Sequence, residues 1–159
     1  MHTIPKSPLE VDVKEKILVV ENDFAIGLDL IMEIDQFGYE VVGLTDRADQ
    51  ALEIAYLLRP ELALIEIGIP GTLDGVHTAG LLLRAFEIPA IFLASNMDSS
   101  TLARAEEAFP LGYLTKPYKS DELRAVLAFA LRQTRKRKAI RRTSKGAEMR
   151  AGNVEAVTV

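Results

Sequence analysis

Five short apolar runs alternate along the chain with segments in which apolar residues recur every three or four positions. Runs that are apolar at almost every position are typical of strands buried on both faces of a parallel sheet, whereas the longer spacing is typical of helices. The predicted strands cover residues 16–20, 40–44, 62–66, 90–94 and 112–115. The predicted helices cover residues 24–36, 46–60, 75–86, 101–109 and 120–131. This alternation predicts an α/β fold, with a doubly wound, five-stranded parallel sheet and helices on both of its faces.

The sequence predicts one domain between two terminal segments. Residues 1–14 contain two prolines and few apolar side chains, which predicts a flexible lead-in to a domain over residues 15–131. In residues 132–159 the apolar periodicity lapses. There, nine Lys and Arg stand against two Asp and Glu, a net charge of +7, whereas residues 1–131 carry −11. Beyond a turn or two of continued helix, this composition predicts a basic, disordered tail.

Composition also narrows the class of protein. Cysteine is absent, which excludes a disulfide framework and a cysteine-based metal site. No run of 18 or more apolar residues occurs, and the first 15 residues hold no apolar leader, so no membrane span and no secretion signal are predicted. The expectation is a cytoplasmic protein without a membrane partner.

Polar residues that could form a binding or catalytic site lie where the predicted strands end. Glu21 and Asn22 follow the first strand, Glu66 ends the third, and Lys116 follows the fifth. Parallel strands share one carboxyl edge, and binding sites in such sheets form there. Clustered carboxylates repel one another unless a cation lies among them. Lys116 is the built-in cation, and a divalent ion such as Mg²⁺ or Ca²⁺ is the other candidate.

Four segments around these strand ends carry a family resemblance. They are Ile17–Asp23, Leu64–Gly71 followed by Asp74 and Gly75, Ile88–Leu93, and Gly112–Tyr118. Together, over about residues 14–131, they resemble the receiver domains of bacterial two-component response regulators. The resemblance implies the flavodoxin-like receiver fold. It also implies a phosphoryl group taken from a histidine kinase onto an aspartate, with Mg²⁺ held by neighbouring acids.

The chain departs from that family at three positions. Glu66 stands at the phosphoacceptor position, Asn22 at the second metal-binding acid, and Ala94 where a Thr or Ser hydroxyl binds the phosphoryl group. Glutamate carries its carboxylate one methylene further out than aspartate, and a displacement of about 1 Å can cost roughly 100-fold in rate. Asn22 adds no charge, and it fits a helix cap as well as a site residue. These changes argue against efficient phosphoryl transfer.

Three other positions follow the family. Glu21 matches the first acid of the acidic pocket, Lys116 the phosphate-pairing lysine, and Tyr113 the aromatic switch, although a partly buried tyrosine can also be a core residue. Lys116 is predicted to form a standing ion pair with Glu66. Glu21, Glu66 and the backbone of Gly68 remain as weak candidates for holding Mg²⁺, so the only cofactor expected is weakly bound Mg²⁺.

Three functions fit these observations. The first is a stand-alone, degenerate receiver that is not an enzyme and acts as a protein-interaction module, with a histidine kinase or another signalling protein as partner. Receivers commonly pair, which makes a homodimer through residues 101–109, 112–115 and 120–131 possible. The second is a functional phosphoacceptor. The third is a nucleic-acid-binding regulator that uses the basic tail. The acidic domain and the absence of aromatic residues in that tail argue against this third function.

Overall fold

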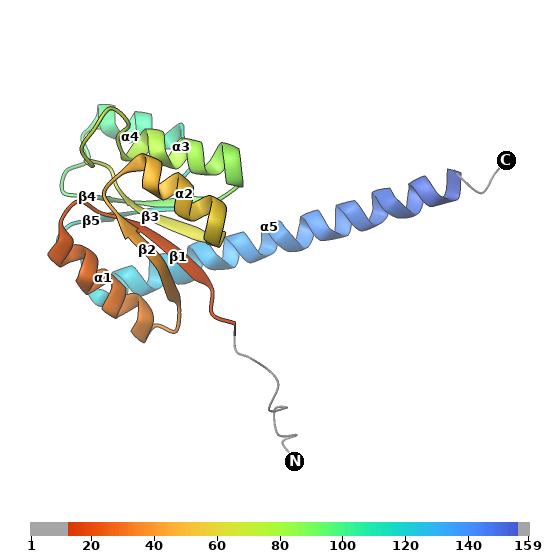
Figure 1. Ribbon diagram of the computed structural model, residues 1–159, viewed down its shortest axis with the longest axis horizontal. Coiled ribbons are helices and arrows are strands. Elements are labelled where there is room, and N and C mark those ends of the chain that lie inside the picture. The colour runs from red at the N-terminus through yellow and green to blue at the C-terminus, as the bar shows by residue number, and fades with distance from the viewer. Residues whose placement is uncertain (1–12, 156–159) are drawn as a thin grey trace, which may run out of the picture.

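Strands and helices alternate along the chain in the predicted order (Figure 1). The computed structural model describes residues 13–155, so the predicted lead-in lies almost wholly outside the described residues. The strands are β1 (Lys16–Val20), β2 (Glu40–Thr45), β3 (Leu62–Glu66), β4 (Ala90–Ala94) and β5 (Gly112–Thr115). The helices are α1 (Phe24–Gln36), α2 (Ala48–Leu58), α3 (Gly75–Phe86), α4 (Ser99–Glu106) and α5 (Ser120–Glu155).

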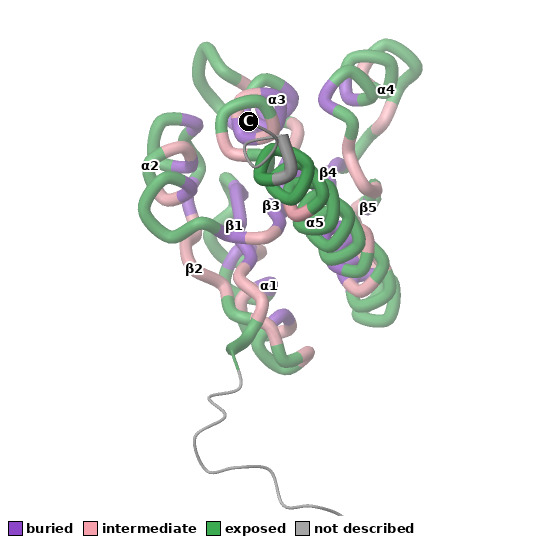
Figure 2. The backbone as a smooth tube through the Cα atoms, turned by 90° about the vertical axis from the view of Figure 1, so that its right-hand side faces the viewer, coloured by how far each residue is buried: buried purple, intermediate pink, exposed green. Residues whose placement is uncertain are grey.

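All five strands are parallel and lie in the order β2-β1-β3-β4-β5. Helices α2, α3 and α4 cover one face of the sheet, and α1 and α5 cover the other (Figures 1 and 2). This arrangement confirms the doubly wound, flavodoxin-like fold. It also brings the carboxyl ends of β1, β3, β4 and β5 to one edge. None of the described helices combines the length and apolar character needed to cross a membrane.

The apolar runs of the strands supply two separate cores. Leu18, Ile65 and Phe92 belong to the core under α2, α3 and α4. Their chain neighbours point the opposite way, so Leu64 and Leu93 belong to the core under α1 and α5. Every residue of β3 and β4 is buried, which explains why these strands are apolar along their whole length.

Helix α4 differs in its bounds from the predicted helix over residues 101–109. It begins at Ser99 because the side chain of Asp98 caps it, accepting a hydrogen bond from the Thr101 backbone N–H at 2.7 Å. It ends at Glu106, and Phe109 adopts a left-handed φ of 48°, which the backbone of an α-helix does not contain. The periodicity located the helix but not its caps.

The predicted disordered tail is wrong beyond the turn or two of continued helix that the sequence allowed, because α5 continues without a break from Ser120 to Glu155. The domain boundary predicted at residue 131 therefore falls inside a helix. Apolar periodicity, which reports a helix face packed on a core, stops near Leu131. The continuation is rich in Arg, Lys and Ala, which favour helix without any packing, and it contains no proline.

Ion pairs hold the first turns of this continuation, hereafter the α5 extension (residues 132–155), against the domain. Arg135 pairs with Glu15, Lys138 with Glu61 at 3.8 Å, and Arg141 with Glu87. The three cations recur at three-residue spacing on the side of the helix that faces the sheet. Farther on, the α5 extension projects away from the domain (Figure 1).

Candidate functional site at the carboxyl edge of the sheet

The carboxyl edge of the sheet brings together Glu21, Glu66 and Lys116, as the sequence predicted. Glu21 and Lys116 are each fixed by a backbone hydrogen bond that extends the strand ladder by one step. Glu21 N–H donates to the Thr45 carbonyl at 2.9 Å, and Lys116 N–H donates to the Ala94 carbonyl at 2.8 Å. Glu66 is the last residue of β3 and pairs with Leu93 of β4.

Lys116 contacts both carboxylates. Its Nζ lies 2.7 Å from Oε2 of Glu21 and 2.5 Å from Oε2 of Glu66. The three side chains are shielded from solvent, with exposed fractions of 14% for Lys116, 0% for Glu21 and 10% for Glu66. The contact to Glu21 is a directed hydrogen bond, whereas Oε2 of Glu66 receives no directed hydrogen bond and is held by the charge of the ammonium group.

The remaining carboxylate oxygens are held by nearby backbone groups. Oε1 of Glu21 accepts from the Asp23 N–H at 3.0 Å, and Oε1 of Glu66 accepts from the Gly68 N–H at 3.2 Å. A buried carboxylate needs such partners because an unpaired charge is costly to remove from water. Gly68 therefore supports Glu66 through its backbone N–H.

The ion pairs raise the pKa of Lys116. Burial on its own would lower that pKa, but the contacts with Glu21 and then Glu66 outweigh burial, so the pKa lies above its ordinary value of 10.5. Lys116 is consequently a fixed cation over the whole physiological pH range, shared by two anions.

The other residues singled out from the sequence lie around this cluster without entering it. Asn22 is exposed, and Asp23, not Asn22, caps α1 by accepting from the Ile26 N–H at 3.2 Å. Ala94 is buried at the end of β4. Tyr113 is 36% exposed on β5, with its ring 6.1 Å from that of Phe92, and burial raises its pKa.

Gly75 allows α3 to start directly against the end of β3. A Cβ atom at Gly75 would lie 2.2 Å from the backbone oxygen of Glu66, closer than any side-chain carbon approaches. The Gly75 N–H donates to the Ile67 carbonyl at 3.0 Å. The backbone that carries Glu66 is therefore fixed from both sides.

One ion pair near the site joins residues that the sequence pattern did not connect. Asp74 caps α3 by accepting from the His77 N–H at 3.0 Å, and it also accepts from Arg104 of α4 at 2.6 Å. Partial burial would raise the pKa of Asp74, but the hydrogen bonds from Arg104 and His77 bring it below its ordinary value. Asp74 and Arg104 are 30 positions apart in the sequence, so no local pattern indicated this link between α3 and α4.

A second missed feature is a cleft of about 510 Å³ beside Lys116. Its walls include Asp29 and Glu33 of α1 and Tyr118, which follows β5. Burial first, and then the negative charges of Glu33, Glu21 and Asp29, raise the pKa of Tyr118 to about 12. Tyr118 is the last residue of the matching segment Gly112–Tyr118 and could have been found from its position after Pro117.

We expect the hydroxyl of Tyr118 to titrate near pH 12, about two units above an ordinary tyrosine. Since the folded-state pKa exceeds the unfolded one, this group favours folding below about pH 10, and the contribution is lost as the pH rises toward 12. Ultraviolet difference titration of the wild type and Tyr118→Phe checks this. A high-pH phase that survives in Tyr118→Phe would assign it to another tyrosine and contradict the prediction.

The cluster does not fit a Mg²⁺ ion as it stands. Among the residues that the structure describes, no group of three or more His, Cys, Asp or Glu side chains is placed to hold a metal. Mg²⁺ requires near-octahedral oxygen ligands at about 2.0–2.1 Å. Glu21 and Glu66 both direct an oxygen at the ammonium group of Lys116, which supplies the positive charge that a metal would supply.

Comparison with known proteins agrees with this geometry. The sequence model of the response regulator receiver domain matches residues 17–128. The chain belongs to the response regulator receiver family. Receiver domains are signalling modules of two-component systems, and that role applies to this receiver.

This receiver is similar to parts of longer regulators. Transcriptional regulatory protein PdtaR of Mycobacterium tuberculosis is 26% identical over 133 residues, which cover 84% of this chain and 64% of PdtaR. Phyllosphere-induced regulator PhyR of Methylorubrum extorquens is 30% identical over 125 residues, 77% of this chain and 46% of PhyR. This receiver thus spans between about half and two thirds of those relatives.

Solved receiver structures superpose closely on it. The signal receiver domain of a modulated diguanylate cyclase from Desulfovibrio desulfuricans is 34% identical, with a TM-score of 0.73 over 77% of this chain and 98% of that one. A CheY-like receiver domain protein from Methanospirillum hungatei has a TM-score of 0.72 over 79% of this chain and 99% of that one. At 22% identity it supports the fold alone.

Proposed function

We propose that this receiver is degenerate at its phosphoacceptor site and acts, without enzymatic activity of its own, as a protein-interaction module in two-component signalling. The observation that carries the proposal is the double contact of Lys116 with Glu21 and Glu66. In the family that the chain belongs to, the matching lysine pairs with a phosphoryl group. Here its charge is already matched by two carboxylates, one of them at the phosphoacceptor position.

The residues around the contact support the same proposal. Attack on a phosphodonor needs a carboxylate oxygen free to approach phosphorus, but Oε2 of Glu66 lies 2.5 Å from Lys116 and Oε1 accepts from Gly68. Ala94 has no hydroxyl to bind the transferred group. Phosphoryl transfer depends almost wholly on positioning and on charge stabilisation, so the loss of both is severe.

We expect the purified protein to remain unmodified when incubated with acetyl phosphate and Mg²⁺. Intact mass measurement after such an incubation tests the proposal, with a receiver that has an aspartate at this position as the positive control. A stoichiometric gain of one phosphoryl group, mapped to Glu66, would instead establish the rival function, a working phosphoacceptor. The retained Glu21, Tyr113 and Lys116 are the observations that favour that rival.

We also expect Mg²⁺ to bind only weakly, because the ion must displace Lys116 from two carboxylates at once. Isothermal titration calorimetry should give a dissociation constant in the millimolar range, as is typical where few charged ligands are available. Tight binding, in the low micromolar range, would show that the carboxylates are free of Lys116 in solution.

The partner that this proposal requires is another protein, a histidine kinase or a further signalling protein. A second copy of the receiver is one such partner. The face predicted for a homodimer, residues 101–109, 112–115 and 120–131, exposes apolar side chains that support this: Leu102, Phe109, Tyr113 and Phe129. The homodimer stays a prediction.

A further inference from the structure

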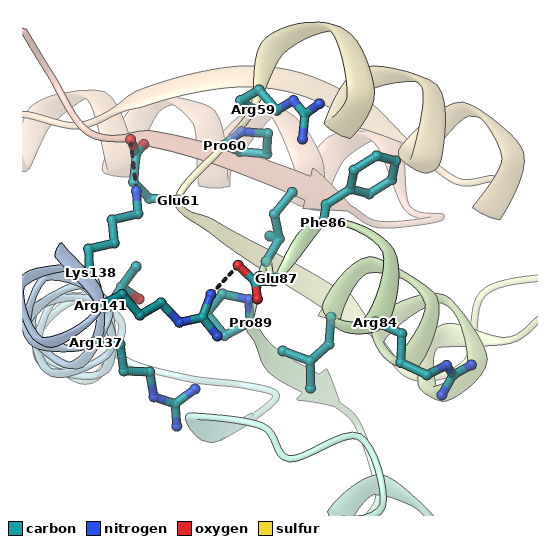
Figure 3. A pocket seen from close by; sticks show the side chains of 13 residues that line it. Arg59, Pro60, Glu61, Arg84, Phe86, Glu87, Pro89, Arg137, Lys138 and Arg141 are labelled. Atoms are coloured by element: carbon teal, nitrogen blue, oxygen red, sulfur yellow. Dashed lines mark hydrogen bonds and ion pairs between the residues drawn. The ribbon is translucent and has the colours of Figure 1, made fainter. Parts of the chain in front are cut away.

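A cavity of about 400 Å³ lies at the opposite, amino-terminal edge of the sheet, far from the Lys116 cluster (Figure 3). One wall is the α5 extension. The facing walls are the α2–β3 turn at Arg59 and Pro60 and the α3–β4 turn from Phe86 to Pro89. The cavity therefore exists only because α5 continues past residue 131.

The charges around this cavity are mostly positive. Five basic side chains line it against two acidic ones, Glu61 and Glu87. The two acids neutralise the helix cations nearest to them, since Lys138 pairs with Glu61 and Arg141 with Glu87. Arg59, Arg84 and Arg137 form no ion pair with another described residue. Figure 3 shows these three arginines on different sides of the cavity.

The same surface continues along the α5 extension. Arg142 and Lys145 line the next hollow along the helix, which also includes Lys138 and Arg141 and the acids Glu87 and Glu148. No Asp or Glu occurs between Arg132 and Ala147. Like charges recur at four-residue spacing, as in Arg132 and Lys136, and such pairs destabilise an isolated helix. A helix of this kind, projecting into solvent, gains stability from any bound polyanion that neutralises it.

We propose that the basic surface formed by Arg59, Arg84, Arg137, Arg142 and Lys145 binds the phosphate backbone of a nucleic-acid duplex. The partner must be extended, because the unneutralised cations lie around the rim of the cavity and along the helix. The two helix cations nearest the acids of the cavity, Lys138 and Arg141, already have carboxylate partners.

The chemistry of the surface favours a duplex over a single strand. Residues 132–155 contain no aromatic side chain on which exposed bases could stack. A helix about 10–12 Å across fits a DNA major groove about 12 Å wide. The rest of the domain is strongly acidic, so it repels phosphates and confines the contact to this surface. Arginine and lysine contacts to phosphate carry no sequence information, so the binding is independent of sequence.

The test is fluorescence anisotropy of a labelled DNA duplex titrated with the full chain at several salt concentrations. We expect the logarithm of the affinity to fall linearly with the logarithm of salt, with a slope of roughly −4 to −5 for five phosphate contacts. The double variant Arg59→Gln, Arg84→Gln should bind more weakly, and its slope should be smaller by roughly two. Both substitutions lie outside the α5 extension. They therefore distinguish binding by the whole surface from binding by the basic α5 extension alone.

The matched control is Lys119→Gln with Arg124→Gln, which removes the same charge from exposed positions elsewhere on the domain and should leave the slope unchanged. Circular dichroism verifies that both variants are folded. An unchanged slope in the Arg59, Arg84 variant would overturn the proposal, because the tail alone would then account for binding. Equal affinity for single-stranded and duplex DNA would also overturn the proposal. Displacement of the duplex by polyglutamate at equal charge would overturn it too, and would indicate an acidic protein as the partner.

Discussion

Replacing Lys116 with Met should lower the free energy of unfolding at pH 7 by about 3 kcal/mol, because the change leaves two buried carboxylates without their cation. Methionine keeps most of the apolar stem of lysine, so the loss of stability reports the removal of the positive charge. The side chain of Glu21 is fully shielded from solvent and that of Glu66 nearly so. Urea unfolding followed by circular dichroism measures the difference.

The pH dependence of that loss identifies its cause. Because the folded-state pKa of Lys116 lies above its unfolded value, its contribution is fully present below about pH 10.5 and disappears as the pH rises through the folded-state value. The stability difference between the wild type and Lys116→Met should therefore be constant from about pH 7 to 9 and shrink in more alkaline solution. Lys119→Met, at an exposed neighbouring position, should change stability by less than about 0.5 kcal/mol. An equal loss in both variants would show that the buried cluster has no special role.

Restoring the family's residues should restore the chemistry. We expect the triple variant Glu66→Asp, Asn22→Asp, Ala94→Thr to take up one phosphoryl group from acetyl phosphate in the presence of Mg²⁺, at a rate at least about 100-fold above that of the wild type. Shortening the side chain at Glu66 withdraws its oxygen from Lys116. The carboxylate introduced by Asn22→Asp adds metal-binding charge, and the threonine offers a hydroxyl to the transferred group.

Single variants separate these contributions. Glu66→Asp alone should stay far below the triple variant, because the second acid and the hydroxyl are still missing. Intact mass time courses provide the comparison, with Lys116→Met in the triple background as the control that lacks the phosphate-pairing charge. A triple variant that stays unmodified while folded would mean that features outside these three positions block the reaction.

The sequence predicted the parallel sheet, the common edge at which its strands end, and the proximity of Glu21, Glu66 and Lys116 at that edge. It could do so because strand periodicity and parallel topology fix which residues share an edge. It predicted the Glu66–Lys116 ion pair but not the hydrogen bond from Lys116 to Glu21. The position of a long side chain between two acids depends on rotamers, which a sequence pattern does not encode.

The largest error was the tail after Leu131. Helix there is stabilised by backbone propensity and by pairs such as Lys138 with Glu61, whose partners lie 77 residues apart in the sequence. Periodicity detects only helices that bury an apolar face. The Asp74–Arg104 pair was not predicted for a related reason. An ion pair between residues far apart in the sequence leaves no local sequence pattern.

The most direct test of the standing contact between Glu66 and Lys116 is a double-mutant cycle on those two residues. Unfolding free energies of the wild type, Glu66→Gln, Lys116→Met and the double variant isolate the energy of the pair from the other effects of each change. We expect the sum of the stability losses in the two single variants to exceed the stability loss in the double variant by about 1 kcal/mol or more. If the two single losses sum to the double loss within about 0.5 kcal/mol, the standing Glu66–Lys116 contact is contradicted. Lys116 would then be held by Glu21 alone, and Glu66 would be free to accept a phosphoryl group.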